Sequence, residues 1–98
     1  MTTAYEIASH IRSRHEFSGE MQMHKLLYYA QAWSLAWDGV PLFDDRIEAW
    51  KNGPVVPSLR HTTVMADEDV RLTDQQKANI DAVLAHYADN SGTALGEL

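Results

Sequence analysis

The sequence predicts a small, mainly α-helical domain of the α+β class, in which a short β element accompanies one central, buried helix. Residues 21–37 are apolar along one stripe at helical spacing. Amphipathic stretches on both sides of this segment predict further helices, and residues 46–51 have the side-chain pattern of a strand. The 98 residues are expected to form a single domain.

Composition argues against several classes of function. Eight basic and fourteen acidic side chains give a formal charge of −6, so we expect neither nucleic acid nor an anionic membrane as the main partner. The chain has no cysteine, which excludes disulfides and thiolate metal sites. Apolar runs are too short to span a membrane, and the first residues lack the pattern of a signal peptide. A cytoplasmic protein is therefore expected.

The first helix is expected over residues 3–14. Thr3 and Glu6 have the spacing of a capping box, in which each side chain satisfies a free backbone amide of the other residue. Arg12 and Arg14 fall in the last turn, where the helix dipole favours basic side chains.

The central helix is expected from residue 18 or 19 to Asp38. Its main stripe consists of Met23, Leu26, Leu27, Ala30, Trp33, Ser34 and Trp37. A second apolar patch on the opposite side consists of Met21, Tyr28, Ala32 and Leu35. We therefore expect other elements to cover this helix on two sides. Gly39 can adopt the left-handed conformation that ends a helix, and Pro41 prevents its resumption.

Residues 40–57 are the least helical part of the chain. A strand is expected at about 46–51, followed by a turn at Asn52-Gly53. Pro54 lacks an amide donor, so we prefer an extended entry into a third helix over a simple hairpin. Pro57 suits the first position of that helix, which is expected to continue to about Met65.

The last third of the chain contains a candidate strand and a clear helix. Residues 70–72 are a candidate second strand that would pair with the strand around Ile47. Thr73 and Gln76 form a second capping box, and the helix that they open is expected to end near residue 88. A turn at 89–92 and at most one and a half helical turns over 93–98 follow.

No set of residues has the spacing of a catalytic, cofactor or metal site. The five histidines have no ligand spacing, and the chain has no phosphate-binding or nucleophile motif. An enzyme would need a cleft that brings Glu48 and Asp44 together with a histidine such as His61, since acid–base chemistry needs positioned groups. We therefore expect no enzyme, no catalytic residue, no metal and no cofactor.

Some polar and aromatic residues allow more than one interpretation. His24 lies off the main stripe and is expected at the surface or its boundary, whereas Ser34 is expected to bond to its own helix backbone. Trp33 and Trp37 are expected in the core. Trp50 is either a core residue or an anchor for a partner, because tryptophan is enriched at interface hot spots.

The sequence resembles the Panacea domain, the phage-associated family that includes GepA-like and SocA-like proteins. The family carries a K-L-L-Y-Y-A-Q helix followed by P-L-F, I-E-A-W and G-P-V-V-P. These motifs stand here in order at residues 25–31, 41–43, 47–50 and 53–57, and the downstream L-T-x-x-Q-K is at 72–77.

The resemblance implies a non-catalytic interaction domain. Family members are similar to antitoxins, which bind and neutralise a protein toxin, and one type delivers its toxin to a Clp-type protease. The expected setting is the cytoplasm of a bacterium or a phage-infected host cell. The alternative is a phage-encoded effector that binds and modulates a host protein.

The irregular segment between residues 43 and 59 is the expected contact surface for a protein partner. The residues expected to bind it are Phe43, Glu48, Trp50, Asn52, Gly53, Pro54, Val55 and Leu59. Two features depart from the family pattern. Arg60 replaces a usual aromatic, and the sequence stops at Leu98, where a further family helix would be starting. We expect a homo-oligomer or a partner chain to cover the C-terminal surface.

Overall fold

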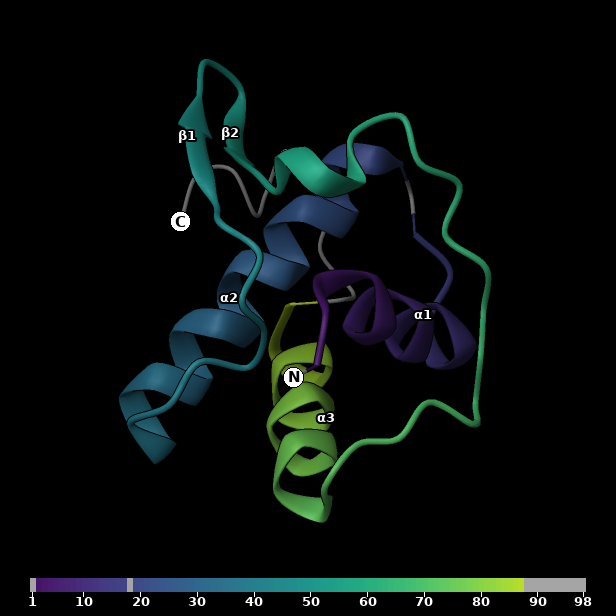
Figure 1. Cartoon of the computed structure of the whole chain (residues 1–98), viewed down its shortest axis with the longest axis vertical. Coiled ribbons are helices and arrows are strands. Elements are labelled where there is room, and N and C mark those ends of the chain that lie inside the picture. The colour runs from purple at the N-terminus through teal and green to yellow at the C-terminus, as the bar shows by residue number, and fades with distance from the viewer. Residues whose placement is uncertain (1, 18, 88–98) are drawn as a thin grey trace.

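The computed structural model describes residues 2–17 and 19–87 (Figure 1). In chain order the elements are α1 (Ala4–Arg14), α2 (Glu20–Asp38), β1 (Glu48–Trp50), β2 (Gly53–Val55), the 3₁₀ helix η1 (Pro57–Leu59) and α3 (Asp74–Tyr87). The predicted class, mainly α with a short β element, is confirmed. The turn predicted at 89–92 and the segment predicted at 93–98 lie outside the described residues.

The predicted helix ends are confirmed by specific backbone contacts. The Thr3 hydroxyl accepts a hydrogen bond from the Glu6 amide at 3.2 Å, and the Glu6 carboxylate accepts one from the Thr3 amide at 3.0 Å. Thr73 and Gln76 make the same reciprocal pair before α3. Gly39 has a φ of 71° and ends α2 with a bond from its amide to the Leu35 carbonyl.

Helix α2 lies at the centre and contacts α1, α3 and β2 (Figure 1). The core that these elements bury consists of Ala4, Ile7, Ala8, Ile11, Met23, Leu26, Leu27, Ala30, Leu42, Phe43, Val56, Leu59, Val64, Ile80 and Val83. None of the helices in the described residues has the length and apolar character that a membrane span requires.

The prediction that α2 is covered on two sides is wrong. Met21, Tyr28 and Leu35 follow one another at intervals of seven residues, and each is more than 40% exposed. Trp37, expected in the core, is 60% exposed near the C-terminal end of α2, whereas Trp33 is partly buried against the core. The apolar character of a helix face therefore does not settle its burial, because short neighbouring elements cover only part of a helix of 19 residues.

The segment after the central helix forms a hairpin, so the predicted extended entry into a third helix is wrong. Strand β1 pairs antiparallel with β2, with Glu48 opposite Val55, Ala49 opposite Pro54 and Trp50 opposite Gly53. Hydrogen-bonded and non-hydrogen-bonded pairs alternate along such a ladder. Pro54 fits because its nitrogen faces away from β1 at a non-hydrogen-bonded pair, so its missing amide removes no ladder bond.

The predicted third helix is reduced to η1. Arg60 is extended, with a ψ of 131°, and His61 has a φ of 61°, which stops a helix there. The chain then crosses α1, where the Met65 amide donates to the Tyr5 hydroxyl and the Asp67 amide to the Ser9 carbonyl. Burial of Val64 in the core accompanies this crossing.

The candidate strand at 70–72 is also wrong. Those residues have no strand structure, and Leu72 instead packs, partly buried, against the core just before α3. Strand β1 takes its partner from β2 because a two-residue turn brings β2 back immediately.

Candidate functional site

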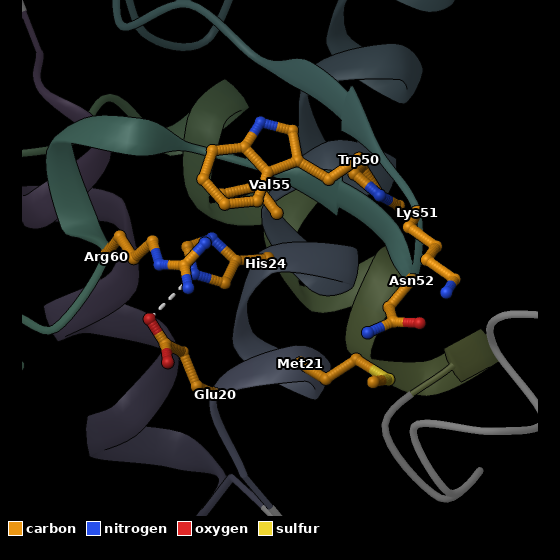
Figure 2. Close-up of a pocket in the computed structure, with 10 residues that line it drawn as sticks. Glu20, Met21, His24, Trp50, Lys51, Asn52, Val55 and Arg60 are labelled. Atoms are coloured by element: carbon orange, nitrogen blue, oxygen red, sulfur yellow. Dashed lines mark hydrogen bonds and ion pairs between the residues drawn. The ribbon is translucent and has the colours of Figure 1, made fainter.

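A groove of about 300 Å³ separates the first turns of α2 from the hairpin (Figure 2). Figure 2 shows Glu20, Met21 and His24 rising from α2, with Trp50, Lys51, Asn52 and Val55 coming from the hairpin. The full lining consists of Glu20, Met21, His24, Trp50, Lys51, Asn52, Gly53, Pro54, Val55 and Arg60. We call this space the hairpin groove.

His24 joins the two sides of the hairpin groove at its base. Its Nδ1 accepts a hydrogen bond from the Val56 amide at 3.1 Å, and its Nε2 lies 3.2 Å from a Glu20 carboxylate oxygen. Because a backbone amide can only donate, Nδ1 is the acceptor, and Nε2 carries the proton that points to Glu20. His24 is only 4% exposed, so the prediction of a surface or boundary position is wrong.

Glu20 ties the beginning of α2 to the segment after η1. The carboxylate oxygen that faces His24 also accepts the His61 amide at 3.1 Å. The hydrogen bond from His24, followed by that from the His61 amide, lowers the pKa of Glu20 below its usual value. Glu20 is therefore a charged group that already has two donors.

Gly53 allows the hairpin turn to approach α2 closely. Its φ is 126°, a conformation that side chains disfavour. A Cβ atom at this position would lie 3.1 Å from Cε of Lys25, whose side chain is buried. The glycine of the G-P-V-V-P motif thus packs against the lysine that begins the K-L-L-Y-Y-A-Q motif.

Trp50 is held in a fixed orientation while 39% of it stays exposed. Its indole Nε1 donates to the Glu48 carboxylate at 2.8 Å, and the other Glu48 oxygen lies 2.9 Å from Nη2 of Arg46. The Arg60 guanidinium lies over the indole ring, 4.4 Å from the ring centroid. Arg60, the departure from the family pattern, therefore covers one face of the Trp50 ring.

Gln31 fixes the segment that leads to the hairpin. Its Oε1 accepts the backbone amides of Leu42 at 2.7 Å and Phe43 at 3.2 Å, while its Nε2 donates to the Phe43 carbonyl at 2.9 Å. One side-chain amide therefore satisfies three backbone groups of two buried residues. Ser34 similarly donates to the Val40 carbonyl beyond α2, and not to its own helix as predicted.

Asp45 fixes the next part of the same segment. Its carboxylate accepts the Ala4 amide at the beginning of α1 at 2.8 Å and the Ser58 hydroxyl of η1 at 2.5 Å. Burial alone would raise the pKa of Asp45, but the hydrogen bonds from Ser58, from Ala4 and from its own backbone amide hold the pKa below its usual value.

The structure brings most of the predicted partner-binding residues together. Trp50, Asn52, Gly53, Pro54 and Val55 line the hairpin groove, and Glu48 holds Trp50. Phe43 and Leu59 are 0% and 3% exposed and belong to the core. They are left out of the surface that we propose below.

The side of the groove formed by α2 was not predicted. Glu20, Met21 and His24 line this side, and Lys25 lies beneath the turn. Two further lining residues, Lys51 in the turn and Arg60 after η1, were not predicted either. The available signal was the pair His24-Lys25, two polar residues in the first turns of an otherwise apolar helix. A buried polar pair needs partners from another element, and here the Val56 amide bonds to His24 while Gly53 packs against Lys25.

Two of the three residues considered for catalysis, Glu48 and His61, have structural contacts. Glu48 binds Trp50 and Arg46, whereas His61 contacts Arg60 and Glu20. Among the described residues, no group of three or more histidine, aspartate or glutamate side chains is placed to hold a metal ion.

A family model described as "Antitoxin SocA-like, Panacea domain" matches residues 23–98. The chain belongs to this family. Searches of curated proteins and of solved structures found no match. Membership of this antitoxin-like family implies a protein partner.

The Panacea motifs are joined to one another in the structure. Gln31 of the first motif binds the backbone of Leu42 and Phe43 in P-L-F. Lys25 of the first motif packs under Gly53, the first residue of G-P-V-V-P. The residues of the motifs therefore make the contacts between α2 and the segment that returns along it.

Proposed function

We propose that this Panacea domain is a non-catalytic interaction protein that binds and neutralises a protein toxin, or delivers that toxin to a Clp-type protease. Membership of the antitoxin-like family is the observation that carries the proposal. The proposed setting is the cytoplasm of a bacterium or a phage-infected host.

The surface that we propose for the toxin is the exposed part of the hairpin. It consists of Glu48, Trp50, Asn52, Gly53, Pro54 and Val55. Two properties support this choice. Trp50 is a large, partly exposed ring of the kind that dominates interface energies. The ring is also oriented by Glu48 and Arg60, so its exposed part is presented in one position.

The test is a growth-rescue experiment in bacteria. The neighbouring gene, beside the one that encodes this chain, is first expressed alone, and its product should arrest growth. When this chain is expressed with it, growth should return. Trp50→Ala should lose the rescue, and affinity capture should show the loss of the complex. Trp37→Ala is the matched control, because it removes another exposed tryptophan at the far end of α2.

A host that lacks Clp proteases separates the two modes of action. Rescue that persists there supports direct neutralisation, whereas rescue that disappears with accumulation of intact toxin supports delivery. A neighbouring product that does not arrest growth, or rescue that fails with a folded chain, contradicts the proposal. Capture of a host protein in that case would favour the alternative, a phage effector.

A further inference from the structure

The hairpin groove combines apolar walls with a basic rim in a chain whose formal charge is −6. We infer that it binds an acidic segment of the protein partner, in which one large apolar side chain enters the groove and neighbouring carboxylates meet Lys51 and Arg60. This inference rests on the proposed function, since it names the chemistry of the partner at the same surface.

The charge of the groove is the first argument. Lys51 and Arg60 are both exposed on its rim. Glu20 is the one carboxylate in the lining, so the two cations outnumber it, and its Oε1 is directed to His24 and the His61 amide. An acidic segment would be repelled by most of this acidic chain, so a local basic rim directs it to the groove.

Glu48, a carboxylate of β1 outside the lining, does not cancel the charge of this rim. Glu48 lies beside Trp50 on β1, but one of its oxygens is paired with Arg46 and the other accepts the Trp50 indole. The negative charge of Glu48 is thus balanced by Arg46, two residues before it in the chain.

The apolar part of the groove is the second argument. Met21 is 44% exposed and Trp50 39% exposed, and Pro54 and Val55, which also line the groove, are half-buried. The volume of about 300 Å³ lies at the lower end of the range for ligand pockets. It suits one aromatic or large aliphatic side chain, which would cover the exposed thioether and indole together.

The geometry of β2 indicates that the segment docks by its side chains. The nitrogen of Pro54 faces the outer edge of β2, so the centre of this edge offers no amide donor to an added strand. Specificity would then come from the apolar anchor and the flanking carboxylates and not from backbone pairing.

The test uses a fluorescein-labelled, C-terminally amidated peptide, Gly-Asp-Glu-Phe-Asp-Glu-Ser-Gly, and the full chain. Binding is followed by fluorescence anisotropy and by backbone amide shifts in ¹⁵N-labelled protein. The acidic peptide should bind, and the shifts should concentrate at Met21, His24 and residues 50–55. Raising the salt from about 25 to about 300 mM should weaken binding about tenfold, because exposed charges are screened.

Variants of the peptide and the chain identify the contacts. Peptides with lysine in place of the acids, or alanine in place of phenylalanine, should not bind. A further peptide has no acidic side chains and ends in phenylalanine with a free C-terminal carboxylate. Its binding would show that a chain end can supply the negative charge. Lys51→Gln and Arg60→Gln should each weaken binding about three- to fivefold. Arg71→Gln, an exposed cation before α3, should leave it unchanged.

Equal binding of the acidic and lysine peptides, shifts confined to another surface, or unchanged affinity in both Lys51→Gln and Arg60→Gln would overturn the inference. The same two variants enter the growth-rescue experiment. Rescue without peptide binding rejects the acidic segment and leaves the proposed function standing. Peptide binding at the groove without rescue by the unmodified chain supports the assigned chemistry and rejects the proposed function.

Discussion

Replacing Gln31 with leucine should destabilise this protein more than any single hydrogen bond would predict. The Gln31 side chain makes three bonds to the backbone of Leu42 and Phe43, and both of these residues are at most 2% exposed. At about 1 kcal/mol net for each bond, Gln31→Leu should lower the free energy of unfolding by about 3 kcal/mol. For a domain of this size, that corresponds to a fall in Tm of roughly 12–24 °C.

Equilibrium urea unfolding, followed by far-UV circular dichroism, measures this free energy directly. Gln75→Leu is the matched control, since Gln75 is exposed on α3 and its side-chain amide donates to Asn79 of the same helix. That change should cost a few tenths of a kcal/mol. The cost of Gln31→Glu should lie between those of Gln31→Leu and Gln75→Leu. A carboxylate still accepts hydrogen bonds from both amides, but it presents an oxygen to the Phe43 carbonyl.

The reasoning is refuted if Gln31→Leu costs no more than the Gln75 control, because the segment at 42–43 would then be held by burial alone. An equal cost for Gln31→Leu and Gln31→Glu would show that the single bond to the Phe43 carbonyl matters more than the two accepted amides.

Three further outcomes are expected. Asp45→Ala should cost about 1–2 kcal/mol at neutral pH. Because the pKa of Asp45 is lowered by folding, its contribution is complete above about pH 4 and should vanish as the pH falls through its folded pKa, so urea midpoints of both forms should converge in acid. Gly53→Ala should cost about 1–3 kcal/mol, since the backbone conformation and the approach of Lys25 both oppose a side chain; a cost below that of Gly39→Ala would contradict this. Thr3→Ala should lower stability by about 1 kcal/mol through loss of the capping box, and an unchanged Tm would count against it.

Local rules accounted for the helices and their ends. The capping boxes at Thr3 and Thr73 and the stop at Gly39 depend on residues within a few positions of one another, so the sequence contains the whole signal. The same rules failed between residues 53 and 72. Whether Pro54 breaks a hairpin depends on which ladder pair it occupies, and that depends on the register with β1.

The candidate site was predictable only on its hairpin side. Trp50 and the residues around Gly53 stand out by type, but the burial of His24 depends on the Val56 amide, 32 residues later in the chain. Arg60 looked like a departure from the family pattern, whereas its place over the Trp50 ring follows from the extended backbone after η1. Phe43 and Leu59 were expected at the surface, but both are buried in the core that the helices share.

The contacts around Trp50 have a consequence for the thermodynamics of association. A side chain that is free in the unbound protein loses about 0.5–1.5 kcal/mol of rotamer entropy when a partner immobilises it. The indole of Trp50 already donates to Glu48 on its edge and lies under Arg60 on one face. Most of its freedom is therefore lost during folding, and a ligand that reaches the remaining face meets a rigid ring, which increases its affinity by about two- to tenfold over a mobile one.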